Sequence, residues 1–462
     1  MNDSMGCASS LTDKRRTFLL TRNLTCLWCS QLLSQIADGI TKLALLWFVY
    51  SVTGSALQTT AVAILQTVSS VVCTPLIGLL VDRLPKKPIL VITDLLRGVI
   101  LGVVPWLLPL DGLTVDVVYL LVFLYGVASA VFTPALSASM PHLVSAQHFT
   151  AGNALLQSTT SIGIILGPIM SGIGIAALGP KDVLSLNTLT YLASVGLLLP
   201  MHFRGHTSRE AGRRPSLPSA MLEAFRFTFH TSPALARLIV IASLYTFGSA
   251  ALTTLLPVYG KTLFHFGPVE VGYFWSSLGV GFLIVSLALL PVSHWALRAR
   301  LYVVTAASCV AGMALMLLLE TTEPMAAFAL MAVVGAGLGT LTPVAWGILQ
   351  ELSPLSMLGR VMGFYTAMAM MTSLLGIWFF GWVTQSVGEA AGLFGIGLVL
   401  LLVAATSLVF MKRMSQVPSR DSLRVPFSMA VEEPPHAKTR WARARVATFM
   451  GAFMGVAPRT RP

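Results

Sequence analysis

Four polar side chains recur at helical spacing in one apolar stretch near the start of the chain. Gln31, Gln35, Asp38 and Lys42 are separated by 4, 3 and 4 residues, which at about 100° per residue places them on one narrow stripe of a helix. A polar stripe on an apolar helix predicts the wall of a water-filled cavity within a membrane. Asp38 precedes Lys42 by one helical turn, which is the favourable order for an ion pair within a helix.

Asp94 and Arg97 form a second candidate ion pair, three residues apart in a later apolar stretch. Ionised side chains are expensive in hydrocarbon, so they should face protein or water. Asp38 or Asp94 is therefore a candidate proton carrier, with Lys42 and Arg97 as the neighbouring cations. The alternative is that both pairs are structural and hold the N-terminal part of the chain together.

The composition indicates a protein with many membrane spans. Of the 462 residues, 55% are hydrophobic and 10% are charged, with a mean hydropathy of +0.80, whereas a soluble domain is about 25% charged. A net charge of +12 would suggest nucleic-acid binding in a soluble protein, but here the positive-inside rule explains it better. Since no nucleophile–base pair or metal-ligand spacing is visible, we expect no enzyme activity, no cofactor, no metal and no nucleic-acid partner.

The apolar stretches predict an all-α membrane protein with twelve transmembrane helices. A helix needs about 20 apolar residues to cross a bilayer. Stretches that meet this requirement lie near residues 24–50, 58–80, 88–110, 115–139, 149–178, 182–201, 235–259, 269–293, 301–320, 325–351, 360–385 and 390–411.

The basic residues predict the orientation of these spans. Segments that would lie on one side of the membrane hold 26 of the 30 Lys and Arg residues, and basic loops remain in the cytoplasm. We therefore expect a multi-pass protein of the plasma (inner) membrane with both termini in the cytoplasm.

The predicted organisation has five parts. Residues 1–17 form a cytoplasmic N-terminal segment, and residues 18–201 form a first six-helix half. Residues 202–234 form a cytoplasmic linker, in which Met221, Leu222, Phe225 and Phe229 predict an amphipathic helix on the inner surface. Residues 235–411 form the second six-helix half, and residues 412–462 form a basic tail that we expect to be disordered.

An internal repeat indicates that the two halves are related. Thr133-Pro134 recurs as Thr342-Pro343 and Gly167 recurs as Gly376, both 209 residues later. Two related halves are typical of transporters that hold their substrate between them near the middle of the membrane. A separate glycine run, Gly335 to Gly339, falls in the middle of a span, so it predicts close helix packing rather than a dinucleotide site.

Two motifs resemble those of the major facilitator superfamily. The connection after the second span resembles its signature loop, and the fifth span resembles its antiporter motif, with Ser171 where a glycine is usual. Finer features resemble the branch that contains macrolide-efflux and enterobactin-exporter-like proteins. The residues that match the two superfamily motifs are Gly78, Asp82, Arg83, Lys86 and Lys87 in the signature loop and Gly163, Gly167, Pro168 and Gly172 in the antiporter motif.

The resemblance implies a fold of two pseudo-symmetric six-helix halves and transport by rocker-switch alternating access. It also implies that Asp82, beside Arg83, holds the outward-facing state against the start of the eleventh span near Arg360. A carboxylate suits that position because a helix N-terminus carries a partial positive charge.

We therefore expect a proton-coupled exporter of an amphipathic organic compound such as a drug or secondary metabolite, acting as a monomer in the lipid bilayer. The substrate would lie between the halves. The alternatives are a siderophore or lipid-like metabolite exporter on the same fold, and a membrane scaffold or sensor that acts through the basic tail. The expected cavity residues are Gln31, Gln35 and Gln66 with Asp38 on one side, and Tyr245, Trp346 and Tyr365 on the other.

Overall fold

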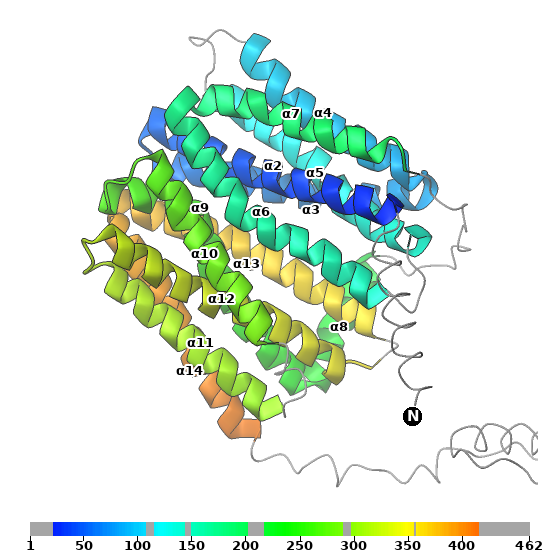
Figure 1. Ribbon diagram of the computed structural model, residues 1–462. Helices are drawn as coiled ribbons and strands as arrows, with labels where there is room; N and C mark the ends of the chain where they lie inside the picture. Colours follow the sequence, from blue (N-terminus) through cyan, green and yellow to red (C-terminus); the bar gives the residue numbers. More distant parts are fainter. Residues whose placement is uncertain are drawn as a thin grey trace, which may run out of the picture. The chain divides into compact units, whose positions relative to one another are not determined.

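The computed structural model describes residues 22–107, 115–143, 149–201, 217–289, 297–354 and 357–414. Every regular element in these ranges is a helix (Figure 1). The N-terminal segment, the first part of the linker and the predicted tail from residue 415 onward lie outside them, while residues 412–414 belong to the last helix. The first half consists of α2 (Arg22–Thr53), α3 (Ala56–Arg83), α4 (Lys86–Leu107), α5 (Val115–Leu143), α6 (Phe149–Leu178) and α7 (Pro180–Leu198).

The second half follows a short helix that lies in the predicted linker. This helix is α8 (Leu217–Arg226), continued by the π-helical turn η3 (Phe227–Thr231). The second half consists of α9 (Pro233–Leu263), α10 (Pro268–Ala288), α11 (Leu297–Leu318), α12 (Pro324–Leu352), α13 (Leu358–Ser386) and α14 (Glu389–Met414). Each of the twelve predicted spans coincides with one long helix, α2–α7 or α9–α14.

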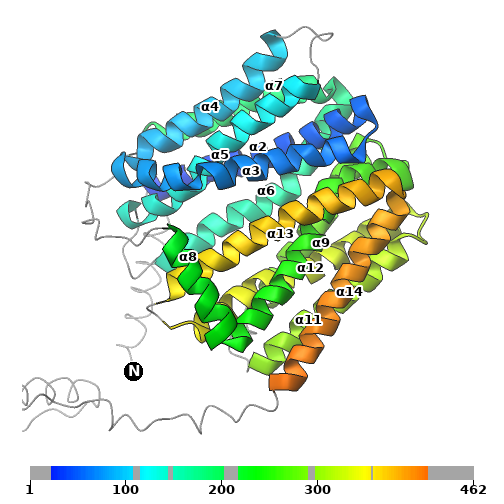
Figure 2. The ribbon, with the colours of Figure 1, turned by 180° about the vertical axis from the view of Figure 1, so that it is seen from behind.

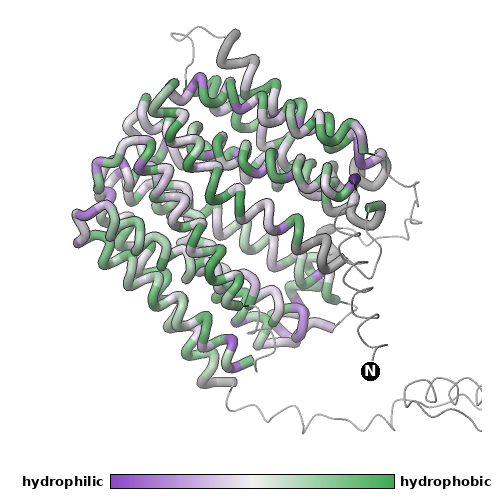
Figure 3. The backbone as a smooth tube through the Cα atoms, in the orientation of Figure 1, coloured by the Kyte–Doolittle hydropathy of each residue, from purple (hydrophilic) through white to green (hydrophobic). Residues whose placement is uncertain are grey.

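The length and the apolar outer faces of the helices suit a lipid environment. Within the described residues, ten helices are long and apolar enough to cross a membrane by length and composition. Large apolar side chains such as Leu189, Leu287 and Leu317 are exposed on their outer faces, which suits contact with hydrocarbon rather than water. Figure 3 shows hydrophobic residues along the helices, with the most hydrophilic residues mainly near the helix ends. Of the two remaining long helices, α4 carries both Asp94 and Arg97, and α7 has only 19 residues.

Successive long helices run in opposite directions, which gives the helical bundle two ends. We call the end where α2 begins and α8 lies the α8 end, and the opposite end, where α2 leads into α3, the far end. Within the first half α2 packs against α6 and α7, and within the second half α9 packs against α13 and α10 against α12. Between the halves, α6 packs against α10 and α3 against α13.

The halves meet closely at the far end. The amide of Ala56, at the start of α3, donates to Gln385 Oε1 near the end of α13 at 2.9 Å, and the Lys261 ammonium lies 5.3 Å from the Trp47 ring centroid. Figure 2 shows α3 and α13 converging at this end and separating toward α8.

Glycines permit the close contacts on which both halves depend. Gly167 of α6 lies against Gly39 of α2, where an added Cβ would be 2.7 Å from the Gly39 Cα. Gly376 of α13 lies in the same way against the Phe247 carbonyl of α9. The repeated glycine therefore has the same role in each half, since it lets the fifth helix of the half approach the first. The run in α12 has a similar role, with Gly335 against α10 and Gly337 against α11.

The antiporter-like motif also joins the halves. A Cβ at Gly272 of α10 would be 2.6 Å from the carbonyl oxygen of Pro168 of α6, and Gly172 approaches the Pro268 carbonyl reciprocally. Gly163 and Gly167 of the same motif face α2 instead. One helix, α6, thus uses its small residues on two faces, one within its half and one toward the other half.

The predicted amphipathic helix is present as α8 with η3. Its Phe225 and Phe229 rings pack together with Phe364 of α13, at centroid distances of 4.9 to 6.3 Å. Glu223 of α8 pairs with Arg360 at the start of α13. The linker helix is therefore attached to the second half by both apolar and ionic contacts.

We predict that Gly376→Ala lowers the thermal stability of the purified protein, because its methyl group would overlap the Phe247 carbonyl. Overpacking of this kind costs about 1–3 kcal/mol. The control is Gly363→Ala on the same helix, which has open space beside it and should keep or raise stability. Size-exclusion profiles after heating measure both variants, and equal behaviour would contradict the packing role.

Candidate functional site

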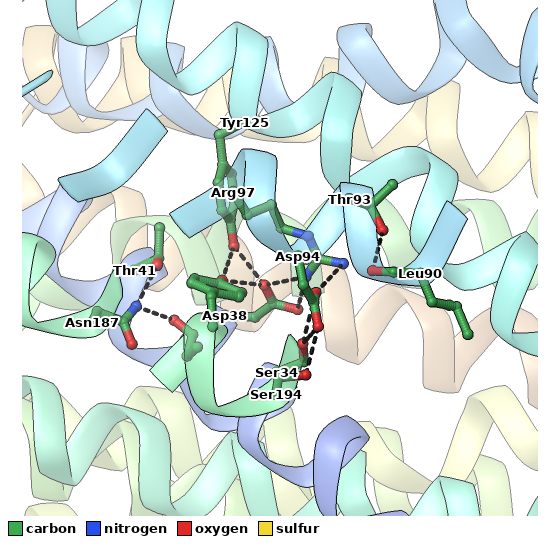
Figure 4. A network of polar contacts seen from close by, with 12 residues as sticks. Ser34, Asp38, Thr41, Leu90, Thr93, Asp94, Arg97, Tyr125, Asn187 and Ser194 are labelled. Atoms are coloured by element: carbon green, nitrogen blue, oxygen red, sulfur yellow. Dashed lines mark hydrogen bonds and ion pairs between the residues drawn. The ribbon is translucent and has the colours of Figure 1, made fainter. Parts of the chain in front are cut away.

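Arg97 is the centre of a polar network inside the first half (Figure 4). Its side chain is 1% exposed, and it lies between two carboxylates: Nη1 is 3.1 Å from Asp38 Oδ1, and Nη2 is 3.4 Å from Asp94 Oδ1. The guanidinium also lies over the Phe132 ring, 4.3 Å from its centroid. A buried guanidinium needs such compensation because the low dielectric makes an unpaired charge very costly.

Asp94 is sealed within the protein. Its side chain is fully buried, and it accepts hydrogen bonds from Ser34 Oγ of α2 at 2.9 Å and from Ser194 Oγ of α7 at 2.6 Å. With Arg97 on the same helix, this carboxylate joins α4 to α2 and α7. The predicted Asp94–Arg97 ion pair is therefore present, and it is buried.

Asp38 differs from Asp94 because one side of it is open. Its side chain is 33% exposed and lines a cavity of about 370 Å³. On its protein side, Oδ1 lies 2.5 Å from the Tyr125 hydroxyl and 2.8 Å from the Tyr191 hydroxyl, which are themselves 2.8 Å apart. Two hydroxyl protons serve these three contacts, so the arrangement has more than one hydrogen-bonding pattern available. Asp38 thus connects a buried network to a cavity.

Lys42 does not pair with Asp38, contrary to the expectation from their spacing. Its ammonium lies instead 5.2 Å from the ring centroid of Trp275 on α10, in the other half. Asp38 is turned toward Arg97 on α4, since the guanidinium provides a nearer and more buried cation. Asn187 of α7 holds this part of α2 by donating to the Ala37 carbonyl and to Thr41.

The cavity lies between the two halves. One part, of about 400 Å³, is bounded by α2, α3, α9, α12 and α13, and the other part adjoins Asp38. Lys42, Gln66, Thr67 and Met370 line both parts. The two parts therefore share the polar face of α2 and α3, with Met370 of α13 opposite it.

The expected cavity residues divide into two groups. Gln66, Trp346 and Tyr365 lie in the cavity wall, and the Trp346 and Tyr365 rings meet edge to face at 6.2 Å. Gln31 is buried, and Gln35 packs against Gly163 of α6. Tyr245 is buried as well and donates to the Leu338 carbonyl at 2.5 Å. These three residues therefore lie behind the wall and do not form it in this conformation.

Four residues of the network were not predicted, because no spacing or motif in the sequence connects them to Asp38 or Asp94. Tyr125, Tyr191, Ser34 and Ser194 come from three helices, and common residue types in separate spans cannot be matched without knowing how the helices are rotated. A tyrosine in the middle of an apolar span is the one available hint, because a buried hydroxyl needs a partner.

The signature-like loop is shorter than expected. Helix α3 continues through Gly78, Asp82 and Arg83, and α4 begins at Lys86, so only Leu84 and Pro85 separate the two helices. The side chains of residues 74–83 lie outside the described part, and the gating role of Asp82 and Arg83 stays a prediction. The ammonium of Lys86 donates to the Leu84 carbonyl at 3.1 Å, and that of Lys87 donates to the Leu199 carbonyl at 2.5 Å.

The described residues contain no group of three or more His, Cys, Asp or Glu side chains that could hold a metal ion. What the site offers chemically is a carboxylate that faces a cavity, a separate cation and a polar cavity between two helical halves. That combination suits binding and charge exchange rather than bond formation.

Comparison with known proteins agrees with this geometry. Residues 27–376 match the family model of the Major Facilitator Superfamily. The multidrug efflux pump Tap of Mycolicibacterium fortuitum is 26% identical over 392 residues, which cover 82% of this chain and 93% of the pump. Macrolide efflux protein A of Streptococcus pyogenes is 25% identical over 343 residues, which cover 72% of this chain and 82% of that protein.

Solved structures show the same fold at lower identity. The crystal structure of the nucleoside transporter NupG aligns with a TM-score of 0.66 at 15% identity and covers 86% of this chain and all of the transporter. A POT family transporter in complex with 5-aminolevulinic acid aligns with a TM-score of 0.66 at 12% identity, over 86% of this chain and 97% of that one.

We predict that Arg97→Gln strongly destabilises the protein, by about 3–5 kcal/mol, because it leaves buried carboxylates without their cation. Adding Asp94→Asn to the same chain should restore part of the loss, since it removes one of the stranded charges. Thermal midpoints of the two single variants and the double variant form a double-mutant cycle. Additive losses would show that Arg97 and Asp94 do not depend on each other.

Proposed function

We propose that this chain, which belongs to the Major Facilitator Superfamily, is a secondary active exporter that exchanges protons for an amphipathic organic compound. The observation that carries the proposal is the position of Asp38. Its carboxylate is exposed to the cavity on one side and bonded to Arg97 and two tyrosines on the other. A proton that arrives through the cavity therefore reaches Asp38 and can change its charge.

Protonation of Asp38 has a defined local consequence. The neutral carboxyl group attracts the Arg97 guanidinium less strongly, while Asp94 keeps its ion pair with Arg97 because two serines donate hydrogen bonds to its carboxylate and no side of it faces the cavity. The network then passes from one excess negative charge to neutrality. A change of this size in a low-dielectric site is large enough to alter helix contacts and cargo affinity.

Alternating access supplies the transport step. The contacts at the far end, such as Ala56 with Gln385 and Lys261 with Trp47, close the halves there. If the basic loops and both termini are cytoplasmic, as their charge predicts, these contacts close the outer side of the membrane in the conformation described here. Export then requires the far-end contacts to open while the α8 ends of the halves approach each other.

Two relatives support the direction and the type of cargo. Both are named for efflux, one of several drugs and one of macrolides, and both match this chain over most of its length. The antiporter-like glycines of α6 lie at its contacts with α2 and α10. Such contacts allow one helix to change its packing in both halves at once.

The test is transport by the purified protein in liposomes with an imposed pH gradient. We predict that the wild type exports dye against its concentration gradient, and that Asp38→Asn loses this driven export while it still binds the dye. Asp116→Asn serves as the control because Asp116 is exposed at the start of α5. Cationic, neutral and anionic dyes are compared in the same assay.

Driven export in Asp38→Asn at the wild-type rate would contradict the assignment of Asp38. Export by the wild type that ignores the pH gradient would contradict proton coupling and leave the fold and cavity assignments unchanged.

A further inference from the structure

Lys42 is a cation in the cavity wall, and among the described residues it forms no ion pair with a carboxylate. Among the described residues, no Asp or Glu oxygen lies within 4.0 Å of its ammonium. Its nearest identified partner is the face of the Trp275 ring, at 5.2 Å from the centroid. An aromatic face stabilises an ammonium but leaves its N–H donors available to a ligand.

The nearest acids are engaged elsewhere. Asp38, one turn earlier on α2, is held by Arg97, Tyr125 and Tyr191, and Asp94 is buried behind it. Neither carboxylate therefore neutralises Lys42 directly. The cavity therefore presents the Lys42 ammonium without a directly bound carboxylate, while the excess negative charge of the Arg97 network lies one helical turn away at Asp38.

Three threonine hydroxyl groups in the cavity wall add acceptors rather than donors. Thr253 and Thr254 of α9 donate to the Ala250 carbonyl at 3.1 and 2.8 Å, and Thr366 of α13 donates to the Met362 carbonyl at 2.9 Å. Since each hydroxyl has a single proton, these groups offer mainly lone pairs to the cavity. Lys42, and the side-chain amide of Gln66 beside it, are the donors on the α2–α3 side of this wall.

Polarity changes along the cavity. At a rise of 1.5 Å per residue, Lys42 is about 16 Å along α2 from the end of that helix at the far end. Trp346 is only about 9 Å along α12 from the end of that helix at the α8 end. Trp346 packs on Tyr365, and both line the cavity. The deep part of the cavity therefore holds the cation, and the part nearer the α8 end holds the aromatic rings.

We propose that Lys42 binds an oxyanion of the cargo, so that the exported compound is an amphipathic organic anion or zwitterion with a carboxylate-like group. The acidic group contacts Lys42 and Gln66, and the apolar body lies against Trp346 and Tyr365. This inference rests on the proposed exporter function and adds the charge class of its cargo. It also assigns Lys42 a role in specificity that is separate from the proton-accepting role of Asp38.

The test compares three fluorescent probes that share one apolar body: dansyl-aminohexanoic acid, its methyl ester and dansylcadaverine, which are an anion, a neutral compound and a cation. Binding to the purified full-length protein is followed by energy transfer from tryptophan to the dansyl group. The variants are Lys42→Gln, which keeps donors without charge, and Lys42→Arg, which keeps the charge. Arg237→Gln is the control, because Arg237 is a cation beside the Phe410 ring and is not among the cavity-lining residues.

We expect the wild type to bind the acid at least about tenfold more tightly than the ester, because a hydrogen bond to a charged group usually contributes at least this much to affinity. Lys42→Gln should lose this preference while its affinity for the ester stays unchanged, which shows that the cavity is intact. Lys42→Arg and Arg237→Gln should keep the preference.

A wild-type protein that binds the acid no better than the ester, or that binds neither, would overturn the proposal, as would a preference that survives in Lys42→Gln. Liposome transport separates this proposal from the exporter function. Gradient-driven export of the cation alone would refute the role of Lys42 and uphold the exporter. Selective binding of the acid without driven export would uphold Lys42 and refute proton-coupled export.

Discussion

Arg97 places a permanent positive charge among the helices of the first half, and the surrounding structure is arranged to balance it. Asp94 on the same helix and Asp38 on α2 supply the opposite charge, while serines and tyrosines from α2, α5 and α7 complete their hydrogen bonds. Because an ion pair in a low-dielectric interior tolerates no missing partner, this network fixes the rotation of four helices. The two carboxylates differ in exposure, since Asp94 is buried and Asp38 faces the cavity.

The second constraint is the distance between helices. In lipid no hydrophobic effect drives helices together, so close packing at small residues takes its place. Gly39 with Gly167, Gly172 with Gly272, and Gly376 with Phe247 bring backbones into contact. The same contacts bring α2 close to α6, and α6 close to α10. A change at Asp38 on α2, which itself lines the cavity between the halves, can therefore also reach α10 through α6.

Periodicity and charge predicted most of the fold, because a bilayer demands long apolar helices with their polar loops outside. The Asp94–Arg97 pair was predictable too, since both partners are on one helix turn. The prediction of an Asp38–Lys42 pair was wrong for a related reason. Spacing within a helix shows which partners are possible, but a cation on another helix, here Arg97, can be nearer. Tyr125, Tyr191 and the burial of Gln31 and Tyr245 depend on how separate helices are rotated against one another, and no local pattern records that rotation.

The claim that Asp38 exchanges a proton with the cavity, while Asp94 remains a fixed partner of Arg97, is tested most directly by infrared difference spectroscopy. The pH of the protein in lipid is changed, and the carboxyl C=O band that appears on acidification is compared among wild type, Asp38→Asn and Asp94→Asn. The account predicts that the wild type shows a band that is lost in Asp38→Asn and kept in Asp94→Asn. A band that survives in Asp38→Asn and disappears in Asp94→Asn would contradict it.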